Sequence, residues 1–359
     1  MARLFLCGYF GFGNTGDEAL LEATVAWLRA RRPGLEIAVL SAAPERTARL
    51  GVEPIARGSV RRLVGAVRCA DVVALGPGGL FQDLTSVRSN FYYAAIAYLA
   101  RLWSKPLALV GHGLGPLRSP LARRAAAGAL RRAQVVSVRD EPSAALAAEL
   151  APSCRPRVAA DVAFLLPSDE GRNWRAEVAQ AVERPGAVVG VCPRLGGAVG
   201  EEDLRRLAEA LRGAARGRRV AWLVLPFGGP ADERPSQTLA RLLDGEAAVW
   251  RERLAPSQWL GLVGALDGLV AMRYHAVLFA ARCGVPVAGV ACDPKITFLL
   301  EQLGCAPAVD FAQRAPWSGA EARIAEELFA EGRGEELRRA AGQLAERAAE
   351  ALQPLLELL

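Results

Sequence analysis

Short apolar runs alternate with longer amphipathic stretches along most of this chain. Each apolar run is four to six residues long, whereas the stretches between them place apolar residues three or four positions apart, as in a helix with one buried face. The pattern predicts strands at residues 3–7, 37–40, 72–75, 107–110, 135–138, 188–192, 220–225, 268–271 and 287–290. It predicts helices at residues 17–31, 90–103, 121–132, 202–216, 257–264 and 296–303, among others. Such alternation is typical of parallel sheets covered by helices on both faces.

A polar stretch interrupts the alternation near the middle of the chain. Residues 167–185 begin and end with proline and contain SDEGRNW, which has neither strand nor helix periodicity. A chain of 359 residues is also too long for one ordinary core. We therefore expect an α/β protein with two Rossmann-like lobes, residues 1–170 and 171–334, and a cleft between them. Residues 335–359 are expected to form an amphipathic helix that packs back on the lobes or closes the second one.

Composition and charge narrow the class of protein. Hydrophobic residues make up 52% of the chain and charged residues 23%, as in soluble globular proteins. No apolar run reaches the roughly 18 residues that span a bilayer, and the stretch 4–12 lacks a signal-peptide cleavage site, so we expect a cytoplasmic protein. The net charge is +6, but no basic stripe is interleaved with aromatic residues, which disfavours nucleic acid. Transient contact with an anionic inner-membrane surface remains open.

The cysteine and histidine counts argue against disulfides and a resident metal. The seven Cys include no C-x-x-C pair, and Cys7, Cys192 and Cys292 lie in or next to predicted strands, where a reduced thiol acts as a small apolar side chain. The two His are far apart in the sequence. We therefore expect no metal site.

Three strands of the first half run into glycine-rich segments. Residues 11–16 (GFGNTG) fit the G-x-G-x-x-G pattern between a strand and a helix, and Asn14 and Asp17 lie where that helix begins and offers N–H groups to an anion. NAD is disfavoured because Glu36, the acidic residue at the required distance, lies at the wrong end of its strand. The other segments are 76–83 and 111–116, which contain Gly78, Gly79, Asp83 and Gly113. Three glycine-rich segments at strand ends indicate that the backbone there approaches a bound molecule.

Cationic residues follow other predicted strands. Arg139, Arg194 and Arg273 lie within two residues of a strand end, and Lys295 lies beyond the last strand. His275 and Lys295 stand out because the chain has only two His and two Lys, and Arg neither titrates near neutrality nor provides a compact ammonium group. The set predicts a site for a small, strongly anionic molecule. Structural alternatives are an ion pair of Arg139 with the acidic residue after it, a surface turn at Arg194, and a buried, hydrogen-bonded His275.

The order and spacing of these motifs resemble a known family. GFGNTGDE, GPGGLFQD–LTS, GHGLGP, SVRD, MRYH and DPK look like the motifs of the polysaccharide pyruvyl transferases, in particular the CsaB type of bacterial cell-wall polymer synthesis. The resemblance implies a GT-B-like fold and transfer of a pyruvyl group from phosphoenolpyruvate to a sugar, with no cofactor beyond this donor substrate. For the CsaB type it implies a 4,6-ketal on N-acetylmannosamine of a lipid-linked secondary cell-wall polymer, a modification that anchors surface-layer proteins.

The resemblance also assigns residues. It implies that Arg139, His275 and Lys295 are essential. The chain departs from the family pattern at His112, where Gln is usual, at Pro77 inside a glycine run, and at Cys292, where an aromatic residue is common. The departures bear more on the acceptor than on the donor.

A mechanism consistent with the residues makes His275 the proton donor to the enol carbon. Asp17 or Asp83 would either accept a proton from a sugar hydroxyl or only hydrogen-bond the sugar. Arg139, Arg194, Arg273 and Lys295 would share the phosphate and carboxylate charges of the donor. The further substrate-binding residues would be Asn14, Gly78, Gly79 and Gly113. Two alternatives remain: a GT-B glycosyltransferase that uses a nucleotide-sugar donor, and a non-catalytic sensor of anions or sugar nucleotides.

Overall fold

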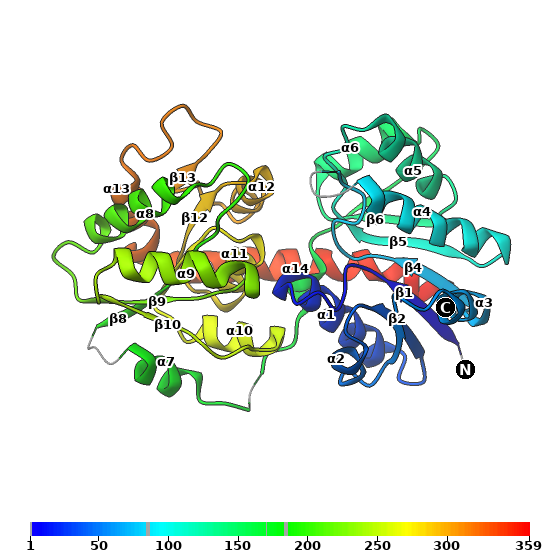
Figure 1. Ribbon diagram of the computed structural model, residues 1–359, viewed down its shortest axis with the longest axis horizontal. Coiled ribbons are helices and arrows are strands. Elements are labelled where there is room, and N and C mark those ends of the chain that lie inside the picture. Colours follow the sequence, from blue (N-terminus) through cyan, green and yellow to red (C-terminus); the bar gives the residue numbers. More distant parts are fainter. Residues whose placement is uncertain (1, 84–86, 170, 183–185) are drawn as a thin grey trace. The chain divides into compact units, whose positions relative to one another are not determined.

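A computed structural model describes residues 2–83, 87–169, 171–182 and 186–359 (Figure 1). The chain forms two compact units. Unit 1 comprises Met1–Pro167 together with Leu344–Leu359, and unit 2 comprises Ser168–Gln343. Each unit contains one parallel β-sheet.

Unit 1 is built on a seven-stranded sheet of order β3-β2-β1-β4-β5-β6-β7. The strands are β1 (Arg3–Cys7), β2 (Glu36–Ser41), β3 (Glu53–Ala56), β4 (Val72–Leu75), β5 (Leu107–His112), β6 (Val135–Val138) and β7 (Arg157–Val158). The strand order reverses between β1 and β4. At such a reversal the loops leaving the two carboxyl ends diverge, and open α/β sheets bind ligands there. The first two glycine-rich segments follow these two strands.

Helices cover both faces of this sheet. They are α1 (Thr15–Arg31), α2 (Pro44–Ala48), α3 (Val60–Cys69), α4 (Val87–Leu102), α5 (Pro120–Leu130), α6 (Glu141–Leu150) and the 3₁₀ helix η1 (Val162–Leu165). One core joins α3, α4, α5 and α6 to the strand side chains that include Phe5 and Val138. Ser137 points to the opposite face because side chains alternate along a strand, and its Oγ donates to Ala351 O of α14 (Arg333–Leu358) at 2.8 Å.

Unit 2 is built on a six-stranded sheet of order β10-β9-β8-β11-β12-β13. The strands are β8 (Ala187–Cys192), β9 (Val220–Val224), β10 (Ala247–Val249), β11 (Gly268–Ala271), β12 (Val287–Ala291) and β13 (Val309–Asp310). The helices are α7 (Trp174–Val182), α8 (Glu201–Ala214), α9 (Pro230–Leu242), α10 (Pro256–Gly264), α11 (Tyr274–Cys283), α12 (Pro294–Gln302) and α13 (Ala320–Phe329). Here the order reverses between β8 and β11, so Arg194 and Arg273 follow the two strands at the reversal.

The predicted α/β class with two parallel sheets is confirmed, and each strand predicted from the apolar runs is present. The strands that the pattern missed are β3, β7, β10 and β13, which have two to four residues and lie toward the sheet edges. Several helices begin earlier than predicted because polar caps and proline start them. Asn14 caps α1, and Pro294 opens α12. None of the described helices is both long and apolar enough to cross a membrane.

Candidate functional site

The glycine loop after β1 is held together by a carboxylate of its own helix. Glu18, in the first turn of α1, accepts hydrogen bonds from Gly11 N at 2.9 Å and Gly13 N at 3.1 Å. Arg46 Nη2 lies 2.9 Å from the same carboxylate, and Asn14 caps the helix. Glu18 therefore occupies the N–H groups of Gly11 and Gly13, which leaves the start of α1 as the part of this segment expected to offer N–H groups to an anion.

Two exposed aromatic rings lie in the same loop. Tyr9 and Phe12 are 44% and 46% exposed, and their rings stack with centroids 4.1 Å apart. The Arg57 guanidinium lies 5.4 Å from the centroid of the Phe12 ring and donates to Gly8 O at 2.9 Å. A flat, exposed apolar surface beside a cation suits the face of a sugar ring. This pair was not predicted, because two aromatic residues in a loop give no periodic signal.

The backbone segments that leave β4 and β5 run side by side. Gly78 N donates to Gly111 O, and Gly113 N donates to Gly78 O, both at 3.3 Å. A Cβ added to Gly78 would lie 3.5 Å from the Asp17 carboxylate, and the following residue, Gly79, is exposed. The structure therefore brings the predicted residues Asp17, Gly78 and Gly113 together at the reversal of strand order.

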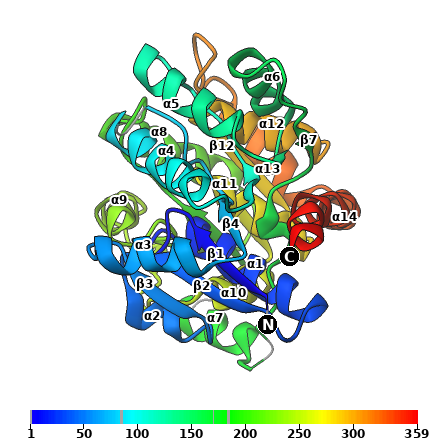
Figure 2. The same cartoon turned by 90° about the vertical axis from the view of Figure 1, so that its right-hand side faces the viewer.

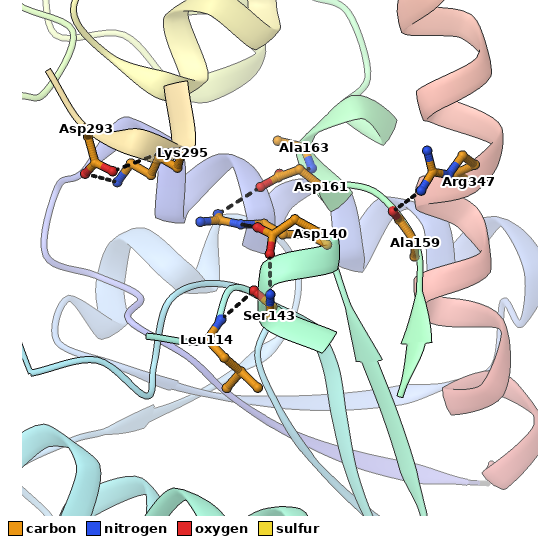
Figure 3. A network of polar contacts seen from close by, with 10 residues as sticks. Leu114, Asp140, Ser143, Ala159, Asp161, Ala163, Asp293, Lys295 and Arg347 are labelled. Atoms are coloured by element: carbon orange, nitrogen blue, oxygen red, sulfur yellow. Dashed lines mark hydrogen bonds and ion pairs between the residues drawn. The ribbon is translucent and has the colours of Figure 1, made fainter. Parts of the chain in front are cut away.

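Arg139, directly after β6, lies between the carboxylates of Asp140 and Asp161, which are labelled in Figure 3. Its Nε is 3.4 Å from Asp140 Oδ2, and its Nη1 is 3.2 Å from Asp161 Oδ2. The side chain is 12% exposed, and a Cβ added to Gly113 would come within 2.6 Å of the guanidinium. The ion pair of Arg139 with Asp140, which the sequence offered as a structural alternative, is thus present. Asp161 was not predicted, because its only signal in the sequence is its position before the short helix η1, where it accepts from Ala163 N at 3.0 Å.

Asp83 orders the loop that leads into α5. Its Oδ2 accepts from Arg118 N and Ser119 N, both at 2.6 Å, and its own N–H donates to Pro116 O at 3.1 Å. A carboxylate held in this way suits loop structure better than proton transfer, which leaves Asp17 as the candidate base of unit 1. The LTS part of the second motif, residues 84–86, lies outside the described residues.

His112, the last residue of β5, is completely buried. Its Nε2 lies 3.0 Å from Leu75 O, so this nitrogen carries the proton and donates it. Burial lowers the pKa of His112 to about 4, and the nearby Arg139 charge acts in the same direction. The imidazole is therefore neutral at physiological pH. It connects the ends of β4 and β5, and its carbonyl oxygen accepts from Arg139 N at 3.0 Å.

In unit 2 a buried carboxylate holds Arg273, the residue just before α11. Asp232 is completely buried and accepts from both Nε and Nη2 of Arg273, with Nε at 2.9 Å. It also accepts from Gly228 N at 2.6 Å. The Arg273 side chain is 23% exposed, so part of the guanidinium reaches the surface. The pairing of Asp232 with Arg273 was not predicted, because 41 positions separate the two residues.

Two further cations lie at neighbouring strand ends of unit 2. β8, β11 and β12 are adjacent in the sheet, so Arg194, Arg273 and Lys295 share one edge. Burial raises the pKa of Cys292, and the charges of Arg194 and Arg273 oppose this shift only in part, so the thiol stays protonated. Lys295 Nζ lies 3.3 Å from Asp293 Oδ2, and the Asp293 side chain also caps α12 (Figure 3).

His275 lies in the first turn of α11, two residues after Arg273. It is half-buried, and the ring of Tyr274 meets it edge-on with centroids 5.0 Å apart. Because α11 starts where β11 ends, His275 occupies the same edge of the sheet as Arg273 and Lys295.

The predicted site residues thus form two sets, each at the carboxyl edge of one sheet. The set in unit 1 contains Asn14, Asp17, Gly78, Gly79, Gly113 and Arg139, and the set in unit 2 contains Arg194, Arg273, His275 and Lys295. Within the described ranges, no group of three or more His, Cys, Asp and Glu side chains is arranged to hold a metal ion.

Comparison with known proteins adds a family and a fold. A family model for polysaccharide pyruvyl transferase matches residues 14–294. A search of curated proteins found no match.

Solved structures similar to this chain are sugar-nucleotide enzymes and glycosyltransferases. Anabaena Alr3699/HepE, in complex with UDP and glucose, is 15% identical with a TM-score of 0.64, covering 99% of each chain. A putative UDP-N-acetylglucosamine 2-epimerase from Listeria monocytogenes is 13% identical with a TM-score of 0.65, covering 98% of this chain and 94% of its own. MurG from Acinetobacter baumannii is 14% identical with a TM-score of 0.53, covering 100% of this chain and 99% of its own. These likenesses show a GT-B type of fold.

Proposed function

Because this chain belongs to the polysaccharide pyruvyl transferase family, we propose that it transfers the pyruvyl group of phosphoenolpyruvate to a sugar and forms a cyclic ketal. One observation supports this most directly. Arg194, Arg273 and Lys295 come from adjacent strand ends and share one edge of the unit 2 sheet with His275. Phosphoenolpyruvate carries a phosphate and a carboxylate on three carbon atoms, and cations at adjacent strand ends suit that charge.

The transfer requires the donor to gain a proton and to lose phosphate. We assign proton donation to His275, which would protonate the terminal CH₂ carbon to a methyl group and leave the central carbon electron-poor. A sugar hydroxyl oxygen then bonds to the central carbon and gives up its proton to a base. The bond from that carbon to the phosphate oxygen breaks, and inorganic phosphate leaves with the proton that the base took up. A second hydroxyl of the same sugar then bonds to the carbon and gives its proton back to His275, which closes the ketal.

Unit 1 supplies the groups suited to a sugar acceptor. Asp17 is the candidate base, because Asp83 is held by two backbone N–H groups of its loop. The stacked rings of Tyr9 and Phe12 provide a surface for the face of a pyranose. Two carboxylates already compensate the charge of Arg139, so we assign this residue to hydrogen bonding with polar substrate groups rather than to binding a full negative charge.

The resemblance to the CsaB type extends the proposal to a particular acceptor. It would be N-acetylmannosamine in a lipid-linked secondary cell-wall polymer, modified as a 4,6-ketal that anchors surface-layer proteins. Such an acceptor would bring the cytoplasmic enzyme to the inner face of a membrane. No cofactor takes part in this reaction apart from the donor substrate.

The deciding experiment is phosphate release measured with phosphoenolpyruvate and a panel of hexosamine glycosides. We expect release only when donor and acceptor are both present, together with a pyruvylated glycoside in the mass spectrum. Thermal shift with phosphoenolpyruvate, UDP and NAD in parallel tests the alternatives. Stabilisation by UDP but not by phosphoenolpyruvate, with no phosphate release, would replace this proposal with a nucleotide-sugar glycosyltransferase.

A further inference from the structure

One continuous segment of unit 1 contains all of the excess positive charge of the chain. Residues 84–138 include eight Arg and Lys residues and no Asp or Glu, whereas the whole chain has a net charge of +6. The rest of the chain therefore has a net charge of −2. So one-sided a distribution is typical of a surface that meets an anionic partner.

Helix α4, inside this segment, exposes apolar side chains along one face. Phe91, Tyr98 and Leu102 are 45%, 57% and 59% exposed, and Ala95 is exposed between them. Because these residues are spaced three or four positions apart, they lie in one stripe along the helix. The opposite side of α4 is buried, with Tyr93 in the core of unit 1. The stripe is therefore not needed to hold α4 on its sheet.

Basic side chains lie around this stripe. Arg88 and Arg101 are exposed on α4, and Arg124 is exposed on α5, which packs against α4 (Figure 2). The last turns of α4 border a hollow of about 530 Å³, and none of the described residues that line it is acidic. Four cations line this hollow: Arg101, Lys105, Arg131 and Arg132. Within the segment, Arg123 is compensated by Glu149 of α6.

We propose that the α4 face, defined as Phe91, Ala95, Tyr98 and Leu102 with the cations around them, docks on an anionic lipid bilayer. Aromatic and aliphatic side chains of an amphipathic helix enter the headgroup region, while Arg and Lys bind lipid phosphates. A second copy of the chain fits this face poorly, because two surfaces of the same positive charge repel each other.

The α4 face begins close to the unit 1 site. Asn90 Nδ2, in the first turn of α4, donates to Gln82 O at 2.8 Å, and Gln82 belongs to the segment that leaves β4 through Gly78 and Gly79. A protein lying on the bilayer through α4 keeps this edge of the sheet near the lipid headgroups, where the sugar of a lipid-linked acceptor would be. The inference thus deepens the proposed use of such an acceptor.

Vesicle flotation of the full chain tests the α4 face without donor or acceptor. We expect the protein to float with vesicles that contain about 30% phosphatidylglycerol, not with pure phosphatidylcholine, and to be released by high salt. Neutralising Arg101 and Arg131 with Gln should weaken binding about fivefold for each charge removed. The triple variant Phe91→Ser, Tyr98→Ser, Leu102→Ser should weaken it on the order of tenfold or more.

Matched substitutions on α3 serve as controls. Val60 is 71% exposed, and Arg61 and Arg68 are exposed on the same helix, so Val60→Ser with Arg61→Gln and Arg68→Gln removes one exposed apolar and two basic side chains outside the α4 face. These variants should float like the unchanged protein. Equal flotation with neutral vesicles, no flotation, an equal loss in the controls, or self-association through the stripe in sedimentation would each overturn the inference. Phosphate release with phosphoenolpyruvate and a soluble glycoside tests the pyruvyl transfer separately. A failure of membrane docking therefore leaves the proposed reaction untouched, and a failure of the reaction leaves the docking untouched.

Discussion

A glycine can serve a site by leaving room for a neighbouring side chain. A Cβ on Gly113 would lie 2.6 Å from the Arg139 guanidinium, which Asp140 and Asp161 hold in place. In Gly113→Ala we expect Arg139 to be displaced and kcat/KM to fall by about 10²-fold, the loss typical of a misplaced site group. Acceptor-dependent phosphate release measures the effect.

The control for this substitution is Gly34→Ala, because nothing lies within 4 Å of the added Cβ there. Circular dichroism should show both variants folded. If Gly113→Ala keeps full activity, then the position of Arg139 does not matter for the reaction.

His275 is predicted to act in the chemical step rather than in binding. His275→Ala should lower kcat by 10²- to 10⁴-fold, the usual contribution of a general acid, and should leave the affinity for phosphoenolpyruvate nearly unchanged. Donor affinity can be measured by calorimetry with no acceptor present. Lys295→Ala provides the contrast, because losing this cation should weaken donor binding first. A collapse of donor binding in His275→Ala with turnover retained would make His275 a binding residue.

At the scale of elements, the Asp232–Arg273 pair joins the start of α9 to the start of α11. Asp232→Asn removes the charge that compensates a partly buried guanidinium. We expect the free energy of unfolding to fall on the order of 2 kcal/mol, less than for a fully buried pair, because Arg273 is partly exposed. The KM for phosphoenolpyruvate should rise about tenfold, because the guanidinium is no longer oriented.

The neighbouring residue supplies the control. Glu233 pairs with Arg253 at 3.1 Å, and both side chains are more than half exposed. Glu233→Gln should therefore leave stability and KM nearly unchanged, since exposed ion pairs contribute little. An Asp232→Asn enzyme with unaltered KM would show that Arg273 finds its position without this carboxylate.

The elements themselves were largely predictable from the sequence. Buried parallel strands read as apolar runs, so strands such as β4 (Val72–Leu75) and β11 (Gly268–Ala271) were predicted at their observed bounds. Edge strands such as β7 (Arg157–Val158) are too short to produce a pattern. Contacts between distant positions were not predictable either. Nothing local connects Asp161 with Arg139 or Asp232 with Arg273, and Glu18 occupies N–H groups that the glycine pattern left free.

At the scale of the whole molecule, the two units share one arrangement of strands. In each sheet the strand order reverses once, between β1 and β4 in unit 1 and between β8 and β11 in unit 2. The motifs that follow these four strands supply most of the predicted site residues. The sequence shows which predicted strands are followed by candidate site residues, but the pairing order depends on long-range packing that local patterns do not encode. That order explains why residues far apart in sequence share one sheet edge.

Global stability should depend on pH through His112. Its pKa is about 4 in the folded protein, below the ordinary value of 6.5, because burial disfavours the imidazolium. As pH falls below 6.5, the unfolded chain binds a proton that the folded protein does not bind, so the free energy of unfolding decreases. The contribution of His112 to the free energy of unfolding is present in full above pH 6.5. It is lost progressively as the pH falls toward 4, with a total loss of about 3 kcal/mol.

Urea unfolding across this pH range tests the dependence with two substitutions. Gln can still donate to Leu75 O but does not titrate, so His112→Gln should stay close to the unchanged protein at neutral pH and lose less stability in acid. His112→Leu removes the hydrogen bond as well, so it should be less stable than His112→Gln at every pH by about 1 kcal/mol or more, with the same flatter pH dependence. Carboxylates that titrate in this range affect all three proteins alike, so the difference between the curves isolates His112. Parallel curves for all three proteins would mean that another group causes the acid sensitivity.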